Sequence, residues 1–87
     1  MTNRDMDREA MEREGFTGQS VSEINIAYVG YRSADSLLQV EYQNGAIYNY
    51  QDVPFSVWQS CMGAQSKGLF IAQSMKGRFR YYRVNGD

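Results

Sequence analysis

The chain has 87 residues, of which 43% are hydrophobic, 14% aromatic and 22% charged, and its formal net charge is −1. With no histidine and one cysteine, it excludes Ser-His-Asp and Cys-His catalysis, histidine metal sites and an internal disulfide within one chain. No apolar run reaches the ~18 residues that a membrane span needs. The lone cysteine and the charged N-terminus without an apolar segment predict a cytoplasmic protein that lacks a secretory signal.

The first part of the chain is predicted to be separate from the rest. Residues 1–21 are expected to form a flexible, charged tail, and residues 22–87 a single domain. The tail has alternating charges and one aromatic residue. Glu9 and Arg13 stand at i and i+4 in the favourable order, so a short helix over residues 5–14 that binds a partner or covers the domain is the alternative.

Three strands are expected next, in an antiparallel meander. Residues 24–32 alternate apolar side chains, and Gly30 indicates a bulge or a close backbone neighbour. A turn cluster over residues 33–36 follows. The stretch 37–54 then reads as two strands rich in Val, Ile, Leu and Tyr, joined by an Asn-Gly pair, and this is the strongest short-range signal of a hairpin.

The register of this hairpin decides which side chains are buried. A two-residue turn at residues 44–45 would place Tyr48 and Tyr50 on the polar face. A three-residue loop whose last residue, the glycine, is left-handed would pair Val40 with Tyr48 and Leu38 with Tyr50. The second register separates apolar from polar side chains on both strands, and we favour it because foldable sequences are consistent in this way. It predicts that both tyrosines are core residues.

The second half of the domain is expected to form two helices and a last strand. Pro54 suits the first position of a helix, whose apolar stripe comprises Val57, Trp58, Cys61, Met62 and Ala64. Ser66 is predicted to cap a second helix over residues 67–76 that Gly77 ends, with a stripe of Leu69, Ile71, Ala72 and Met75. Residues 79–84 read as a strand. The expected fold is α+β, ordered β-β-β-α-α-β, with a small antiparallel sheet and two short helices packed on one face.

Few residues offer catalytic chemistry. Cys61 is expected to be a small buried hydrophobe rather than a reactive thiol, and Trp58 a core residue, with a binding platform as the alternative. The carboxylates are expected on turns or on polar strand faces, at Glu23, Asp35, Glu41 and Asp52. No glycine-rich phosphate loop is present. We therefore expect a protein that is not an enzyme and has no catalytic residue, metal or cofactor.

The charges are divided unevenly along the chain. Residues 1–52 contain nine acidic and four basic residues, whereas residues 53–87 contain five basic residues and one acidic residue. Basic side chains neutralise phosphates and aromatic rings stack on nucleobases, which together hold single-stranded nucleic acid. The predicted nucleic-acid-binding residues are Lys67, Lys76, Arg78, Arg80, Tyr82 and Arg83, of which Arg78, Arg80 and Tyr82 would form an exposed stripe on the last strand.

Several motifs together resemble the KTSC domain, over about residues 24–84. They are Leu38-x-Val40-x-Tyr42, Gly45, Tyr48-x-Tyr50, Val53-Pro54, Trp58, Ala64-x-Ser66-Lys67-Gly68-x-Phe70, Met75 and Lys76. This module is named for the C-terminus of some lysyl-tRNA synthetases and also occurs as a small protein in bacteria and phages. The resemblance implies little biochemistry, since the family's function is not established. The attachment of the module to a tRNA synthetase suggests RNA binding. The chain departs from the family pattern at Ile71, where an aromatic residue is common, and at Ala72, where asparagine is common.

Two functions therefore stay open. The first is a small non-enzymatic module that binds RNA or single-stranded DNA through the basic C-terminal third. The second is a protein-binding module, such as a phage-encoded inhibitor or accessory protein, that presents a sheet edge, the aromatic face or the acidic tail to its partner. A membrane partner is not expected under either function.

Overall fold

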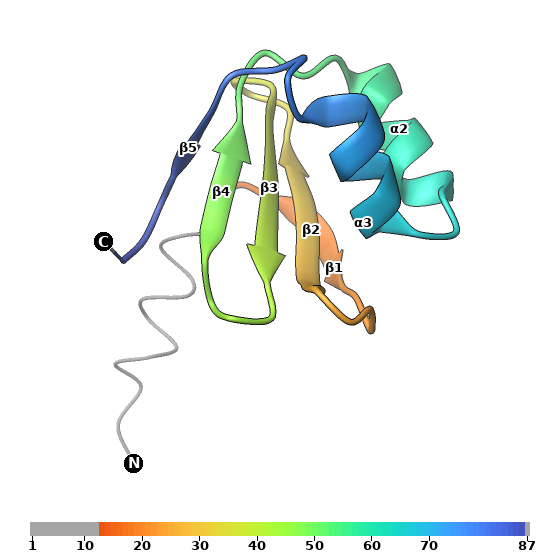
Figure 1. The fold of residues 1–87 in the computed structure, drawn as a ribbon. Coiled ribbons are helices and arrows are strands. Elements are labelled where there is room, and N and C mark those ends of the chain that lie inside the picture. Colours follow the sequence, from red (N-terminus) through yellow and green to blue (C-terminus); the bar gives the residue numbers. More distant parts are fainter. Residues whose placement is uncertain (1–12, 87) are drawn as a thin grey trace.

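The computed structural model describes residues 13–86. Within them, five strands form one antiparallel sheet in the order β1-β2-β3-β4-β5, so that each strand pairs with its neighbours in the sequence (Figure 1). The strands are β1 (Thr17–Ser20), β2 (Ile26–Arg32), β3 (Leu37–Tyr42), β4 (Ile47–Tyr50) and β5 (Tyr81–Arg83). The predicted α+β class and the antiparallel sheet are confirmed.

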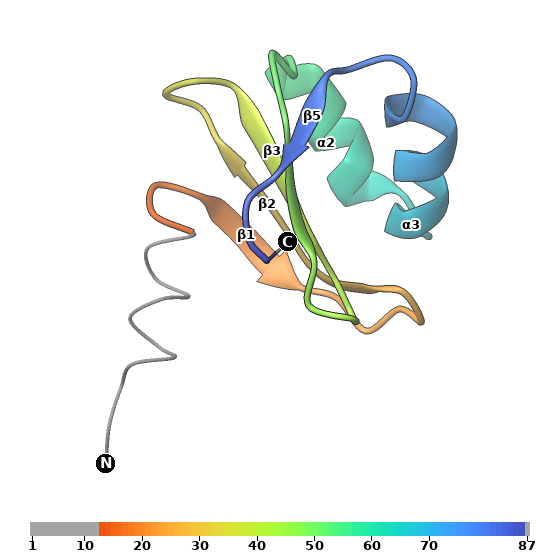
Figure 2. The same ribbon diagram turned by 60° about the vertical axis from the view of Figure 1, so that its left-hand side comes forward.

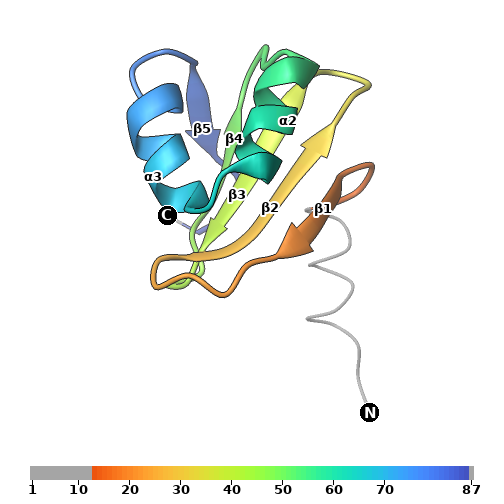
Figure 3. The ribbon, with the colours of Figure 1, turned by 90° about the vertical axis from the view of Figure 1, so that its right-hand side faces the viewer.

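Two short helical segments lie between β4 and β5 in the sequence. They are α2 (Phe55–Gly63) and α3 (Lys67–Phe70), and α3 continues into a π-helical turn, η1 (Ile71–Met75). Both pack on the same face of the sheet, as predicted (Figures 2 and 3). In Figure 3, α2 crosses in front of the middle strands and α3 lies on the side of β5. Over residues 13–86, no helix is long and apolar enough to cross a membrane.

The central hairpin has the favoured register. Leu38 pairs with Tyr50 and Val40 with Tyr48, and the loop closes through a hydrogen bond from the Tyr42 N–H to the Ala46 carbonyl. The loop glycine is left-handed, with φ of 93°. Tyr50 is buried among core residues of both layers, which are Ile26, Val29, Tyr31, Leu38, Val40, Val53, Val57, Trp58, Cys61, Ile71 and Met75. Tyr48 faces the same way but is half-buried, so the prediction that it is a core residue is only partly right.

The meander reaches further toward the N-terminus than the predicted domain. Thr17–Ser20 forms the edge strand β1, paired with Tyr28–Tyr31 of β2, although the sequence assigned these residues to a flexible tail. Their polar, exposed side chains give no apolar pattern, and the strand is held by backbone pairing. Gly18 permits the pairing because a Cβ atom there would lie 2.2 Å from the Val29 carbonyl oxygen. Residues 1–12 of the predicted tail lie outside the described residues.

Strand β2 contains a bulge, but not at the position expected from the sequence. The irregularity lies between Ile26 and Tyr28, not at Gly30. It lets Ile26 and Val29 both face the helices, while Tyr28 faces the opposite side of the sheet. Gly30 is needed because the Tyr28 ring lies over it, where a Cβ atom would come within 2.5 Å of the hydroxyl oxygen. The close neighbour of this glycine is therefore a side chain and not the neighbouring backbone that the sequence suggested.

The second predicted helix has the expected caps, but its last part is π-helical. The Ser66 hydroxyl accepts from the Leu69 N–H at 3.1 Å, and Gly77 follows the helix with φ of 80°. The Lys76 N–H donates to the Ile71 carbonyl five residues earlier, at 3.0 Å, which widens the last turn. Ile71 and Met75 therefore point into the core, whereas Leu69 and Ala72, predicted to be apolar contacts, are exposed.

Within residues 13–86, side chains cover the opposite face of the sheet. The Gln39 side-chain amide donates to Asn49 at 3.0 Å, and the Asn49 amide donates to the Tyr82 hydroxyl at 3.2 Å. Nearby, the Arg13 guanidinium stacks over the Tyr28 ring, 3.7 Å from its centroid. This face is therefore closed by polar and aromatic contacts.

Candidate functional site

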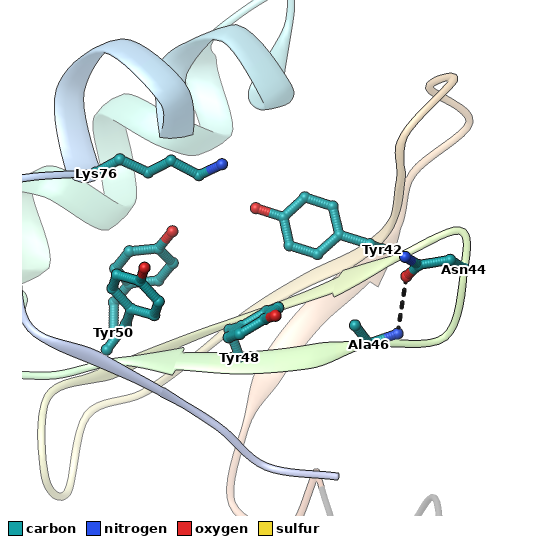
Figure 4. A pocket seen from close by; sticks show the side chains of 7 residues that line it. Tyr42, Asn44, Ala46, Tyr48, Tyr50 and Lys76 are labelled. Carbon is teal, nitrogen blue, oxygen red and sulfur yellow. Dashed lines mark hydrogen bonds between the residues drawn. The ribbon is translucent and has the colours of Figure 1, made fainter. Parts of the chain in front are cut away.

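A pocket of about 280 Å³ lies where the sheet meets the end of the second helix (Figure 4). Strands β3, β4 and β5 and the loop between β3 and β4 provide its floor and walls, and Lys76 extends over it from the end of η1 (Figure 4). Tyrosine rings form most of the lining, which comprises Tyr42, Asn44, Ala46, Tyr48, Tyr50, Lys76 and Tyr81. We refer to it below as the tyrosine pocket.

The rings of the tyrosine pocket are held by one another. Tyr48 contacts Tyr42 and Tyr81 edge-on, with ring centroids 5.9 and 5.8 Å apart. Tyr81 also lies 5.3 Å from Tyr50 in a tilted arrangement. Strand pairing fixes this cluster because Tyr81 is the partner of Tyr50 across β4 and β5. The pocket therefore has firm aromatic walls of the kind that accept a flat ring.

The polar groups of the tyrosine pocket supply more donors than acceptors. The Lys76 ammonium nitrogen lies 5.9 Å from the centroid of the Tyr42 ring. The Asn44 side-chain oxygen accepts from the Ala46 N–H at 3.0 Å, and its amide provides two N–H donors. Burial, and next to it the charge and hydroxyl of Tyr42, raise the pKa of Tyr50 far above 10.0. Its phenol is therefore neutral and able to donate at any physiological pH.

A second hollow adjoins the tyrosine pocket across Tyr81. It has a volume of about 480 Å³, and Gly77, Arg78 and Arg80 line it. Arg78 stacks over the ring of Phe79, 5.0 Å from its centroid, and the guanidinium is exposed. Together with Lys76, these arginines form a short cationic track beside the aromatic pocket. Within residues 13–86, none of the three cations is paired with a carboxylate.

Lys67 lies elsewhere and is engaged by an acidic residue. The Glu23 carboxylate accepts from the Lys67 N–H at 2.7 Å and from the Gly68 N–H at 3.0 Å, at the start of α3. The Lys67 ammonium group donates to the Ala64 carbonyl at 3.2 Å. Burial raises the pKa of Glu23, but the two N–H groups outweigh burial, and its pKa falls below the ordinary 4.5. Lys67, which was predicted to contact phosphate, thus lies at the start of α3 and is not part of the cationic track.

The other two predicted residues do not line the tyrosine pocket. Tyr82 is on the opposite face of the sheet, where its hydroxyl accepts from the Asn49 amide, and it does not line the hollow that Arg78 and Arg80 share. Its neighbour Tyr81 is the ring beside the arginines. Arg83 pairs with Tyr48 across the strands and has its guanidinium against Gly86.

The remaining reactive groups serve the fold. Cys61 is fully buried, and burial raises the pKa of its thiol to about 11, as expected of a small hydrophobe. Trp58 is buried and stacks on Tyr31, which confirms its place in the core. In the part of the chain that the structure describes, no group of three or more Cys, Asp or Glu residues could hold a metal ion.

The tyrosine pocket is the feature that the sequence did not predict. Of its lining, only Lys76 was among the predicted site residues, whereas Tyr48 and Tyr50 were placed in the core. The available signal was the group of three tyrosines, at positions 42, 48 and 50, on two predicted strands. It could not be used because the position of the last strand next to β4 was not known.

Comparison with known proteins identifies the family. The model of the KTSC domain matches residues 22–79. A KTSC domain protein of Yersinia pestis has a similar structure, with a TM-score of 0.73 and 31% identity, over 80% of this chain and 99% of that one. A protein of Tsukamurella paurometabola is 36% identical over 71% of this chain and 92% of its own length.

The same domain forms part of a much larger protein. A lysine–tRNA ligase of Trichormus variabilis is 33% identical over 63% of this chain, and the match spans 10% of the ligase. The chain thus corresponds to about a tenth of that relative and to nearly all of the small ones. With the family model covering most of its length and the fold shared with a solved member, this chain belongs to the KTSC domain family.

Proposed function

We propose that this protein is a small, non-enzymatic module of the cytoplasm that binds single-stranded nucleic acid, with RNA as its first target. The observation that supports this most strongly is the tyrosine pocket beside the cationic track, joined through Tyr81. Aromatic walls accept a base and neighbouring cations neutralise phosphates, which is how single strands are held. The name of the lysine–tRNA ligase relatives gives tRNA as their substrate, which agrees with this choice.

The charge distribution supports the same surface. Two of the acidic side chains in residues 13–86 pair with arginines near the N-terminus, Glu41 with Arg13 and Asp35 with Arg32. A third, Glu23, is bound to the start of α3. These three acidic side chains are thus engaged within the fold, whereas no ion pair to a carboxylate engages the cations near β5 within residues 13–86.

The test is the salt dependence of binding to labelled single-stranded RNA, measured by fluorescence anisotropy. If Lys76, Arg78 and Arg80 each neutralise one phosphate, the logarithm of affinity should fall with the logarithm of salt with a slope of about −2. R78A/R80A should make that slope shallower by about 1.4. K67A removes a positive charge outside the track and is the matched control, expected to leave the slope unchanged. Absence of binding at low salt, or equal losses in both variants, would refute the proposal.

A protein partner is the second candidate, supported by one separate observation. Ile24 and Leu69 are 91% and 56% exposed, and both line a hollow of about 500 Å³ beside the start of α3. Exposed apolar side chains that share a hollow are typical of interaction surfaces. Retention of a partner protein after nuclease treatment, and its loss with I24D but not with R78A/R80A, would favour this candidate over nucleic acid.

A further inference from the structure

The tyrosine pocket has the size and shape for one nucleobase. Its volume of about 280 Å³ lies at the lower end of small-molecule pockets, which begin near ~300 Å³. The Tyr48 and Tyr81 rings stand nearly perpendicular, at 75°, so a flat ligand can lie along one ring and against the edge of the other. A phosphate alone would leave these aromatic walls without a partner.

The tyrosine pocket offers such a base more hydrogen-bond donors than acceptors. Lys76 offers three N–H donors and no acceptor. Asn44 engages its side-chain oxygen with the Ala46 N–H, and its amide adds two further N–H donors. The phenol hydroxyls both donate and accept, and so they do not discriminate. A carbonyl oxygen on the edge of a base therefore has more partners here than an exocyclic amino group, which only the hydroxyls and the Asn44 oxygen can accept.

We infer that the tyrosine pocket reads the base and prefers a carbonyl at pyrimidine C4 or purine C6, as in uracil or guanine, over an amino group at the same position, as in cytosine or adenine. This inference rests on the proposed nucleic-acid function and adds base selectivity to it. Lys76 binds the carbonyl oxygen, Arg78 and Arg80 hold the flanking phosphates, and Tyr81 separates the two sites. The raised pKa of Tyr50 keeps one wall of the pocket uncharged.

Oligouridine and oligocytidine of equal length provide the test, since their bases differ only at C4, a carbonyl against an amino group, and at the adjacent N3, an N–H donor against an acceptor. Because a hydrogen bond to a charged group contributes about 1.5–3 kcal/mol, the full chain should bind oligouridine roughly tenfold more tightly or better. K76M keeps the length of the side chain over Tyr42 and removes the donors, so the ratio of the two affinities should fall toward one. R78A/R80A should weaken both ligands equally and leave the ratio unchanged.

Asn44 provides a reciprocal variant. N44D preserves the oxygen that accepts from Ala46 and replaces the amide donors by an acceptor, so the ratio should shift toward oligocytidine. Circular dichroism checks that each variant is folded. Equal binding of both oligonucleotides by the wild-type protein, or a K76M variant that retains the preference, would overturn base reading while nucleic-acid binding stands. Failure to bind either oligonucleotide would instead refute the proposed function.

Discussion

The contact between Glu23 and the start of α3 gives a sharp prediction about stability. One carboxylate accepts two N–H groups, at 2.7 and 3.0 Å, and ties the loop before β2 to a helix 44 and 45 residues further on. These N–H groups belong to the first turn, where a helix leaves donors without internal partners. Glu23→Ala removes both acceptors at once.

The expected cost is that of losing a helix cap. Loss of a cap destabilises a protein by about 0.5–2 kcal/mol. Because the Glu23 carboxylate is charged, we expect Glu23→Ala to fall in the upper half of this range, at about 1–2 kcal/mol. A small domain has only ~3–5 kcal/mol in total, so this is a large share. The melting temperature should fall by roughly 4–8 °C for each kcal/mol. Urea denaturation followed by the fluorescence of Trp58, which is buried in the core, measures the change.

The pH dependence provides an independent check with a definite sign. Because the folded pKa of Glu23 lies below the ordinary 4.5, its stabilisation is present above about pH 4.5 and is lost as the pH falls through the folded pKa. Glu23→Ala should therefore be closer to the wild type in stability at acid pH than at neutral pH. Glu14→Ala, at an exposed carboxylate, is the control. A Glu23 variant as stable as this control at neutral pH would refute the reasoning.

Three further predictions concern the sheet and the core. Gly18→Ala should destabilise the domain by about 1–3 kcal/mol, because the new Cβ atom meets the Val29 carbonyl oxygen at 2.2 Å; Gly63→Ala, which meets nothing within 4 Å, should be nearly neutral in the same denaturation assay. The phenol pKa of Tyr50 is raised above the ordinary value of 10.0, so stability that is present below pH 10 is lost as the pH rises. Tyr50→Phe should therefore lose less stability above pH 10 than the wild type does, and equal losses in the two proteins would contradict this. Cys61 should react with a thiol reagent only after denaturation, because it is buried and its pKa is raised to about 11; rapid labelling of the native protein would show otherwise.

The parts of the fold that the sequence predicts well have strong local signals. Gly45, which follows Asn44, can adopt the left-handed conformation, and this preference predicts the hairpin register and the inward direction of Tyr50. Ser66 and Gly77 mark the ends of the second helical segment through capping, which depends on residues close in sequence. In these places local preference and burial agree, so the structure follows the pattern.

The parts that were missed depend on distant contacts. β1 has no apolar pattern and forms because Gly18 allows close pairing with β2. The bulge after Ile26 and the wide turn before Lys76 each change which side chains face inward, and neither has a local signature. The tyrosine pocket arises only when β5 pairs with β4, which brings Tyr81 beside Tyr50. These two residues are 31 positions apart in the sequence, so no local pattern indicated the wall that they form.

Photo-crosslinking can locate the base of a bound RNA strand on the protein surface. A single-stranded RNA that carries a photoreactive uracil analogue is irradiated with the full chain, and the attached peptides are identified by mass spectrometry. The tyrosine pocket predicts adducts on Tyr48 or Tyr81, which should be reduced in K76M and unchanged in K67A. Adducts on Tyr82 across the sheet, or on the surface formed by Ile24 and Leu69, would contradict it.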